Sequence, residues 1–179
     1  MLKYLLSCLL FTGAAYAQSA AKLPHAASVA AQLDSATTQV VVVTPALRSQ
    51  PVADALRRAA LRDVKLYLLI DLRYADQGDS YLPGFAGMRL AFRDDPQDDR
   101  VVRIKYSRDL PHYILVDDDL LIEGRLIEHV SAPFDAEPTY VVRDTDALER
   151  RATNFLDLWR EAPEYVSFLD NLDLGALPY

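Results

Sequence analysis

Cysteine and histidine are scarce in this chain of 179 residues, which contains one cysteine and three histidines. A single cysteine, Cys8, can form neither an intramolecular disulfide nor a cysteine-rich metal site. The sequence also lacks a Ser-His-Asp arrangement, a glycine-rich phosphate loop and a dinucleotide-binding fingerprint. These absences exclude small disulfide scaffolds, cysteine-based metal centres and several common classes of enzyme.

Positive charge is also in short supply, because 26 acidic residues face 19 lysines and arginines, a formal net charge of −7. A broad nucleic-acid surface needs clustered basic residues, so the composition argues against nucleic acid as a partner. A small local phosphate site remains compatible with it. The apolar fraction of 51% is too high for a disordered chain, and the length fits one domain with its own core.

The first 17 residues have the organisation of a secretory signal peptide. Lys3 forms a short positive region, Leu5 to Ala15 is uncharged and mostly apolar, and Ala15-Tyr16-Ala17 matches a signal-peptidase site. We therefore expect cleavage after Ala17, a domain over residues 18–179, and a periplasmic or secreted location. The apolar run is too short to span a membrane, and no later run approaches about 20 apolar residues, so no transmembrane segment is expected.

A lipoprotein signal is the rival interpretation, because Leu5-Leu6-Ser7-Cys8 resembles a lipobox. A lipoprotein signal would leave only a short apolar segment ahead of Cys8, so cleavage after Ala17 is favoured. Because Lys3 is the only charged residue among the first 17, cleavage changes the net charge from −7 to −8. It also removes Cys8, and an exported chain without a thiol cannot use a thiolate nucleophile or a cysteine ligand.

The pattern of apolar residues predicts a mixed α/β domain with one sheet and helices on both faces. A strand, a helix and a strand in succession predict a parallel pair near the start of the domain. The expected helices are 26–36, 49–62, a short one over 81–85, 146–160 and 165–174. The expected strands are 39–44, 64–70, 88–92, 101–106, 113–117, 120–123 and 139–142, with an acidic loop over 93–100.

The predicted hairpin carries the most informative motif. It reads Leu110-Pro111-His112-Tyr113-Ile114-Leu115-Val116-Asp117, followed after six residues by Gly124-Arg125. This pattern resembles the phospholipase D superfamily motif H-x-K-x4-D-x6-G-[ST], with Asp117, the six-residue gap and Gly124 in register. The strand-helix-strand over 44–71 and the helix over 147–165 are similar to the superfamily's early and closing elements. The resemblance thus covers most of residues 25–167.

The resemblance implies a phospholipase D-like fold and, from the length, similarity to small periplasmic endonucleases of that superfamily. Those proteins carry one motif per chain and form a homodimer with a shared active site. In the family, one histidine attacks phosphorus, the paired histidine protonates the leaving oxygen, two lysines hold the phosphate charge, and the aspartate orients the imidazole.

This chain departs from the motif at its reactive positions. Leu110 occupies the position of the nucleophile, His112 that of the lysine, Arg125 that of the small hydroxyl residue and Ile127 that of a later asparagine. Shifting the register does not restore the motif, because it puts Ile114 at the lysine position and moves the glycine to the wrong distance. The motif is therefore degenerate.

His112 and Asp117 are the candidate catalytic residues that remain. His112 could be a phosphate contact or a nucleophile in an altered geometry, or it could be a half-buried histidine with local hydrogen bonds. The last interpretation is favoured, because a neutral imidazole is a poor replacement for a permanent cation. Arg125 could supply the lost positive charge, or it could be solvated or paired with Glu123.

No metal and no cofactor are expected. Asp117 to Asp119 with Glu123 lack the spacing of a calcium loop, and turn chemistry alone explains aspartates in a hairpin. The other histidines, His25 and His129, have no partner that their spacing suggests, although a metal pair of His129 with His112 is conceivable.

The sequence leaves three functional hypotheses. The leading one is a non-catalytic protein that binds a partner or a small anion in the envelope. The alternative is a divergent phosphodiesterase, of the nuclease or phospholipase D type, that uses His112 from each subunit of a homodimer together with Asp117 and Arg125. The third is a structural subunit in a mixed dimer with an intact homologue.

Overall fold

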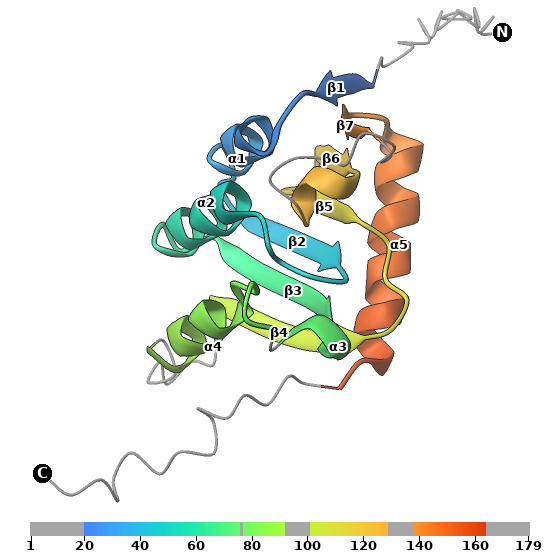
Figure 1. The fold of residues 1–179 in the computed structure, drawn as a ribbon. Helices are drawn as coiled ribbons and strands as arrows, with labels where there is room; N and C mark the ends of the chain where they lie inside the picture. The colour runs from blue at the N-terminus through green and yellow to red at the C-terminus, as the bar shows by residue number, and fades with distance from the viewer. Residues whose placement is uncertain (1–19, 76, 92–100, 129–137, 164–179) are drawn as a thin grey trace, which may run out of the picture.

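The computed structural model describes residues 20–75, 77–91, 101–128 and 138–163 (Figure 1). The predicted signal peptide, the acidic loop over 93–100, His129 and the predicted helix over 165–174 lie outside these residues. Among the described residues, no helix is both long enough and apolar enough to cross a membrane.

The described residues form a single α/β domain around a seven-stranded mixed sheet, with the strand order β1-β7-β6-β5-β2-β3-β4. The parallel part consists of β2 (Gln39–Thr44), β3 (Lys65–Asp71) and β4 (Val102–Ser107). The antiparallel part consists of β5 (Tyr113–Val116), β6 (Leu120–Glu123), β7 (Thr139–Val142) and β1 (Ala21–Leu23).

Helices cover both faces of this sheet (Figure 1). On one face lie α1 (Ala26–Leu33), α2 (Gln50–Ala60) and α4 (Leu82–Ala91), and on the other lies α5 (Thr145–Glu161). Successive residues of a strand point to opposite faces, so Val40 and Val42 enter the first core and Val41 and Val43 the second. This explains why β2 is an unbroken β-branched run: both of its faces are buried.

The predicted α/β architecture, the parallel pair β2–β3 and the hairpin β5–β6 are confirmed. The strand predicted over 88–92 is wrong, because residues 82–91 form α4. Leu82, Phe85 and Ala86 recur at helical spacing and are buried together against the sheet, and this pattern continues past the short helix predicted there. The sequence analysis also missed the short elements β1, α3 (Leu72–Ala75) and the 3-10 helix η1 (Arg125–Ile127).

The topology brings several strand ends together at one edge of the sheet, beside His112. Parallel strands β2, β3 and β4 all end at this edge, and β5 begins there because it runs antiparallel to β2. Tyr113 pairs with Val43, so the residue before β5, His112, lies beside the end of β2. Ligands of open α/β sheets bind outside the carboxyl ends of the strands, so this edge is where a site is expected.

Candidate functional site

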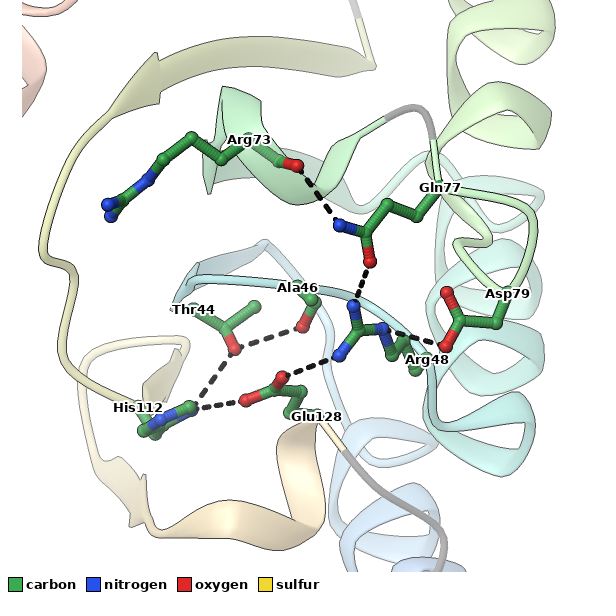
Figure 2. Close-up of polar contacts among 8 residues, drawn as sticks. All are labelled: Thr44, Ala46, Arg48, Arg73, Gln77, Asp79, His112 and Glu128. Carbon is green, nitrogen blue, oxygen red and sulfur yellow. Dashed lines mark hydrogen bonds and ion pairs between the residues drawn. The ribbon is translucent and has the colours of Figure 1, made fainter.

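His112 contacts Thr44 and Glu128 at this edge (Figure 2). Its Nδ1 lies 3.3 Å from Thr44 Oγ1 and 3.5 Å from Glu128 Oε2, and only 17% of its side chain is exposed. Thr44 Oγ1 itself donates to the carbonyl of Ala46 at 3.0 Å, so its one proton is already used. Thr44 Oγ1 and the Glu128 carboxylate therefore both act as acceptors at Nδ1, and these two contacts favour a proton on Nδ1 in a neutral His112.

Glu128 is in turn held by Arg48, from the segment between β2 and α2. Arg48 Nη1 donates to Glu128 Oε1 at 3.2 Å, and the backbone nitrogen of Arg48 donates to the carbonyl of Glu128 at 3.2 Å. Both side chains are largely buried, with 19% and 9% exposed. A carboxylate fixed in this way can fix the imidazole next to it, as orienting carboxylates do for functional histidines.

The network extends from Arg48 away from His112 (Figure 2). Arg48 Nε lies 2.9 Å from Asp79 Oδ2, an ion pair without hydrogen-bond alignment, and Nη2 donates to Gln77 Oε1. Gln77 Nε2 then donates to the carbonyl of Arg73 at 3.2 Å. These contacts occupy the guanidinium of Arg48, so Arg48 is a positioning group for Glu128 rather than a cation presented to a ligand.

Leu110, at the position of the nucleophile in the motif, is only 6% exposed. It belongs to the hydrophobic core under α5, together with Leu69, Tyr113 and Phe155. A leucine offers no lone pair for attack and no proton for transfer, and its burial in the core also removes it from solvent. In this structure the side chain of Leu110 is therefore part of the core packing.

Asp117 lies at the opposite end of β5 from His112. Its carboxylate accepts hydrogen bonds from the backbone nitrogens of Thr37, Thr38 and Gln39 and from the Thr38 hydroxyl, the last at 2.7 Å. His112 lies near the end of β2 and these donors near its start, a separation of about 15–20 Å along a six-residue strand. The structure therefore separates the two candidate residues, and Glu128, not Asp117, contacts the imidazole.

The electrostatics of Asp117 reflect this structural position. Partial burial alone would raise its pKa, but the backbone donor of Gln39 and the donors of Thr38 and Thr37 outweigh it and hold the pKa well below its ordinary value. Asp117 also adopts a φ of 49°, which aspartate tolerates better than most residues. Its carboxylate stays ionised and ties the β5–β6 turn to the start of β2.

A cavity of about 500 Å³ lies next to His112. His112, Arg125 and Arg151 line it together with Pro111, Glu123, Gly124, Pro138 and Tyr140. Arg151 pairs with Glu123 at 2.6 Å, so their charges offset each other. The backbone carbonyl of Arg125 accepts from the backbone nitrogen of Glu128 at 3.1 Å, whereas its exposed guanidinium makes no hydrogen bond or ion pair with the other described residues. The cavity therefore combines an imidazole with one uncompensated guanidinium.

The other candidate groups have structural contacts. Asp118 accepts from Gln39 Nε2 at 3.2 Å, and Asp119 pairs with Arg143 at 2.9 Å. His25 caps α1 by accepting from the backbone nitrogen of Ser28. Over the described ranges, no group of three or more acidic, histidine or cysteine side chains could hold a metal ion.

Sequence reasoning missed Glu128, Thr44 and Arg48 as parts of the site. The family motif ends near Gly124 and Arg125, and nothing in the spacing connects His112 to a glutamate 16 residues further on. An available signal was the Thr44-Pro45 end of a buried strand, because polar residues after such strands face the functional edge of the sheet.

Comparison with solved structures identifies the fold. Nuc from Salmonella typhimurium, described as a phospholipase D family member, superposes with a TM-score of 0.57 at 18% identity, over 78% of this chain and 89% of its own. NucT from Helicobacter pylori gives a TM-score of 0.61 at 12% identity, over 83% of this chain and 98% of its own. The chain has the phospholipase D-like fold.

Larger proteins share the same fold over part of their length. Phosphatidylserine synthase from Haemophilus influenzae gives a TM-score of 0.54 at 12% identity, over 84% of this chain and 39% of its own. No protein-family model matches the chain, and no curated protein matches it. The comparisons therefore show the fold, and any inference about function has to come from the residues around His112.

Proposed function

We propose that this chain is an exported phospholipase D-like protein that binds a small phosphate-type anion beside His112 and does not hydrolyse phosphodiesters. The observation that carries the proposal is Leu110, buried in the core where the family motif has its nucleophile. Loss of an essential nucleophile removes many orders of magnitude of rate. The fold and the cavity are retained, which supports binding.

Arg125 supplies the main attraction for an anion in this cavity. It is exposed and lines the cavity, and its guanidinium can bind a phosphate through two hydrogen bonds. The second cation, Arg151, remains paired with Glu123. His112 adds a ring nitrogen, and it adds a second positive charge when it is protonated.

The binding test uses inorganic phosphate and titration calorimetry on the pure protein. Arg125→Ala should weaken phosphate binding about tenfold, which corresponds to about 1.4 kcal/mol. Arg143→Ala is the matched control, because this exposed arginine pairs with Asp119 at the other end of the hairpin and should leave binding unchanged. Absence of phosphate binding, or equal loss in both variants, would contradict the proposal.

The activity test uses a phosphodiester reporter with a chelator present. We expect no turnover above that of a heat-treated sample. Metal-independent cleavage of the phosphodiester reporter that is abolished by His112→Ala would contradict the non-catalytic proposal.

A divergent phosphodiesterase is the second candidate, and the His112–Glu128 contact is the observation that favours it. Nδ1 of His112 faces the carboxylate of Glu128, an arrangement in which a carboxylate orients an imidazole for nucleophilic or acid–base chemistry. In such an enzyme His112 of each subunit would act, with Arg125 stabilising the phosphate charge, and Glu128→Gln would lower the rate. A phosphorus resonance of trapped phosphohistidine would establish it.

The partner and location remain part of the proposal. We place the chain in the periplasm or outside the cell, with cleavage after Ala17, and as a homodimer or as a mixed dimer with an intact homologue. The predicted signal sequence supports the location, and the single motif per chain supports pairing. N-terminal sequencing of the secreted protein would check the cleavage site.

A further inference from the structure

The face of the sheet under α5 is incompletely covered by the described residues. Three helices pack on the opposite face, whereas α5 alone packs here among the described residues, and Phe155 is the one buried residue of this helix. Leu156, at the edge of this face, has 55% of its surface exposed. A sheet face of this size ordinarily carries more than one helix.

A groove of about 820 Å³ runs between α5 and the uncovered strands. Its floor is apolar, with Val41, Tyr67 and Leu115 from the sheet and Phe155 and Trp159 from the helix. The rings of Tyr67, Phe155 and Trp159 form a cluster with centroids 5.2–6.2 Å apart. The groove is separate from the cavity beside His112 and has a different chemical character.

The chain leaves the described domain at one end of this groove. Helix α5 ends at Glu161, Ala162 is buried, and the backbone nitrogen of Tyr106 in β4 donates to the carbonyl of Pro163 at 3.2 Å. Trp159, which lines the groove, is only four residues earlier. Residues that follow Pro163 therefore start beside the groove and need no long connection to reach it.

The sequence after Pro163 has the composition of a segment that needs burial. Tyr165, Phe168, Leu169 and Leu172 recur at helical spacing, which predicts one apolar face. A helix over ten residues is about 15 Å long, and the three steps from Tyr106 back to Arg103 along β4 cover about 10 Å. Such a helix is therefore longer than this stretch of β4 and long enough to reach the groove from Pro163.

Charge favours the same placement. The segment 164–179 contains Glu164, Asp170 and Asp173 and no lysine or arginine. On the β4 side of the groove, Lys105 Nζ lies 5.1 Å from the Trp159 ring centroid and Arg103 lies 5.9 Å from that of Tyr67. Acidic side chains on the flank of the segment would meet these cations.

Carboxylates at the far end of the groove limit how far an acidic segment can extend along it. Asp118, Asp119 and Glu149 lie around the β5–β6 turn and the first half of α5. Arg143 at the same end pairs with Asp119 and offsets only that charge, so the remaining carboxylates disfavour an acidic segment there and the segment would stay on the side of Tyr67 and Trp159.

We propose that residues 165–174 of this same chain dock into the groove between α5 and strands β2 and β3, with Phe168 and Leu172 against Tyr67 and Trp159. The docked segment completes the second face of the sheet. The surface available to a partner is then the edge around His112 and Arg125 rather than the α5 face. This inference is independent of whether the His112 cavity binds phosphate.

Trp159 is the only tryptophan in the sequence, so its fluorescence reports on this groove alone. In the full chain, the double substitution Phe168→Asp and Leu172→Asp should shift its emission to longer wavelength and raise its acrylamide quenching constant about twofold, because the ring loses its cover. Leu174→Asp, on the opposite side of the predicted helix, is the matched control and should change neither quantity.

Unchanged emission in the double variant would overturn the proposal, and so would equal changes in both variants. Hydrogen exchange on the unaltered chain provides a second measurement in case the double variant unfolds. Protected amides over 165–174 are expected, and exchange at the rate of an open chain would contradict docking. Emission that changes on dilution would show instead that a second copy fills the groove.

Discussion

Asp117 and His112 belong to one motif in the sequence but serve different parts of the molecule. Asp117 accepts hydrogen bonds at the start of β2, whereas His112 contacts Thr44 at the end of β2 and Glu128 just after η1. The structural role of Asp117 is therefore to stabilise the pairing of β5 with β2. Its presence in the sequence does not argue that catalytic chemistry has survived.

Asp117→Asn should destabilise the domain by about 2 kcal/mol at neutral pH, because hydrogen bonds to a charged acceptor are worth about 1.5–3 kcal/mol. Asparagine keeps the side-chain shape and tolerates the positive φ, but its amide nitrogen cannot accept from the Thr37 donors as Oδ2 does, so the variant loses both the charge and one acceptor. Asp119→Asn is the control, since the exposed pair of Asp119 with Arg143 should be worth below about 1 kcal/mol. Urea unfolding measures both.

The lowered pKa of Asp117 also predicts how the effect of Asp117→Asn on stability changes with pH. The pKa of Asp117 is lowered in the folded state, so its stabilisation is complete above the ordinary aspartate value of about 3.9 and is lost as the pH falls towards the folded value. The stability difference between the unaltered chain and Asp117→Asn should therefore shrink in acid. A difference that grows below that pH would contradict this assignment.

At the scale of elements, the turn from β6 into η1 positions both His112 and Glu128. Gly124 has a φ of 131°, and its backbone nitrogen donates to the carbonyl of His112 at 3.1 Å. The following 3-10 helix leads directly to Glu128, whose carboxylate contacts the imidazole of His112. Gly124 matches the family motif because this turn needs a glycine, whatever follows it.

Gly124→Ala should destabilise the domain by more than about 2 kcal/mol, since strained backbone and overpacking each cost about 1–3 kcal/mol. A Cβ there would lie 2.6 Å from the Cα of Thr139 and 2.8 Å from the carbonyl of Pro138, neither of which can move freely. Gly87→Ala is the control, because a Cβ at that position meets nothing within 4 Å. Thermal unfolding of the two variants would separate these expectations.

At the scale of the whole molecule, the edge with His112 and Arg125 is the predicted interface between two subunits. The mass of the native complex should be twice that of the chain if the partner is a second copy. Arg125→Glu should weaken such a dimer about tenfold, or about 1.4 kcal/mol, while Arg143→Glu should leave it intact. A monomer at all concentrations would contradict homodimerisation, and a heavier complex from the source cell would show a mixed dimer.

The sequence predicted the elements whose residues carry a local pattern. The run Gln39–Thr44 specified a doubly buried strand, and the apolar spacing along α5 specified a helix. The prediction failed at Met88–Ala91, where a short apolar stretch fits a strand or a buried helix equally well until its packing partners are known. Recognition of the phospholipase D-like fold also came from the sequence, through the hairpin motif and its flanking helices.

The sequence by itself determined which residues stand at the positions of the resembling motif, with Leu110 in place of its histidine and His112 in place of its lysine, because residue identities need no coordinates. Only the tertiary structure decided what surrounds His112. Thr44, Arg48 and Glu128 come from segments up to 84 residues apart, and sheet pairing brings them to one edge. Only the structure placed Asp117 away from that edge, because an antiparallel strand carries residues five positions apart to opposite ends of its neighbour.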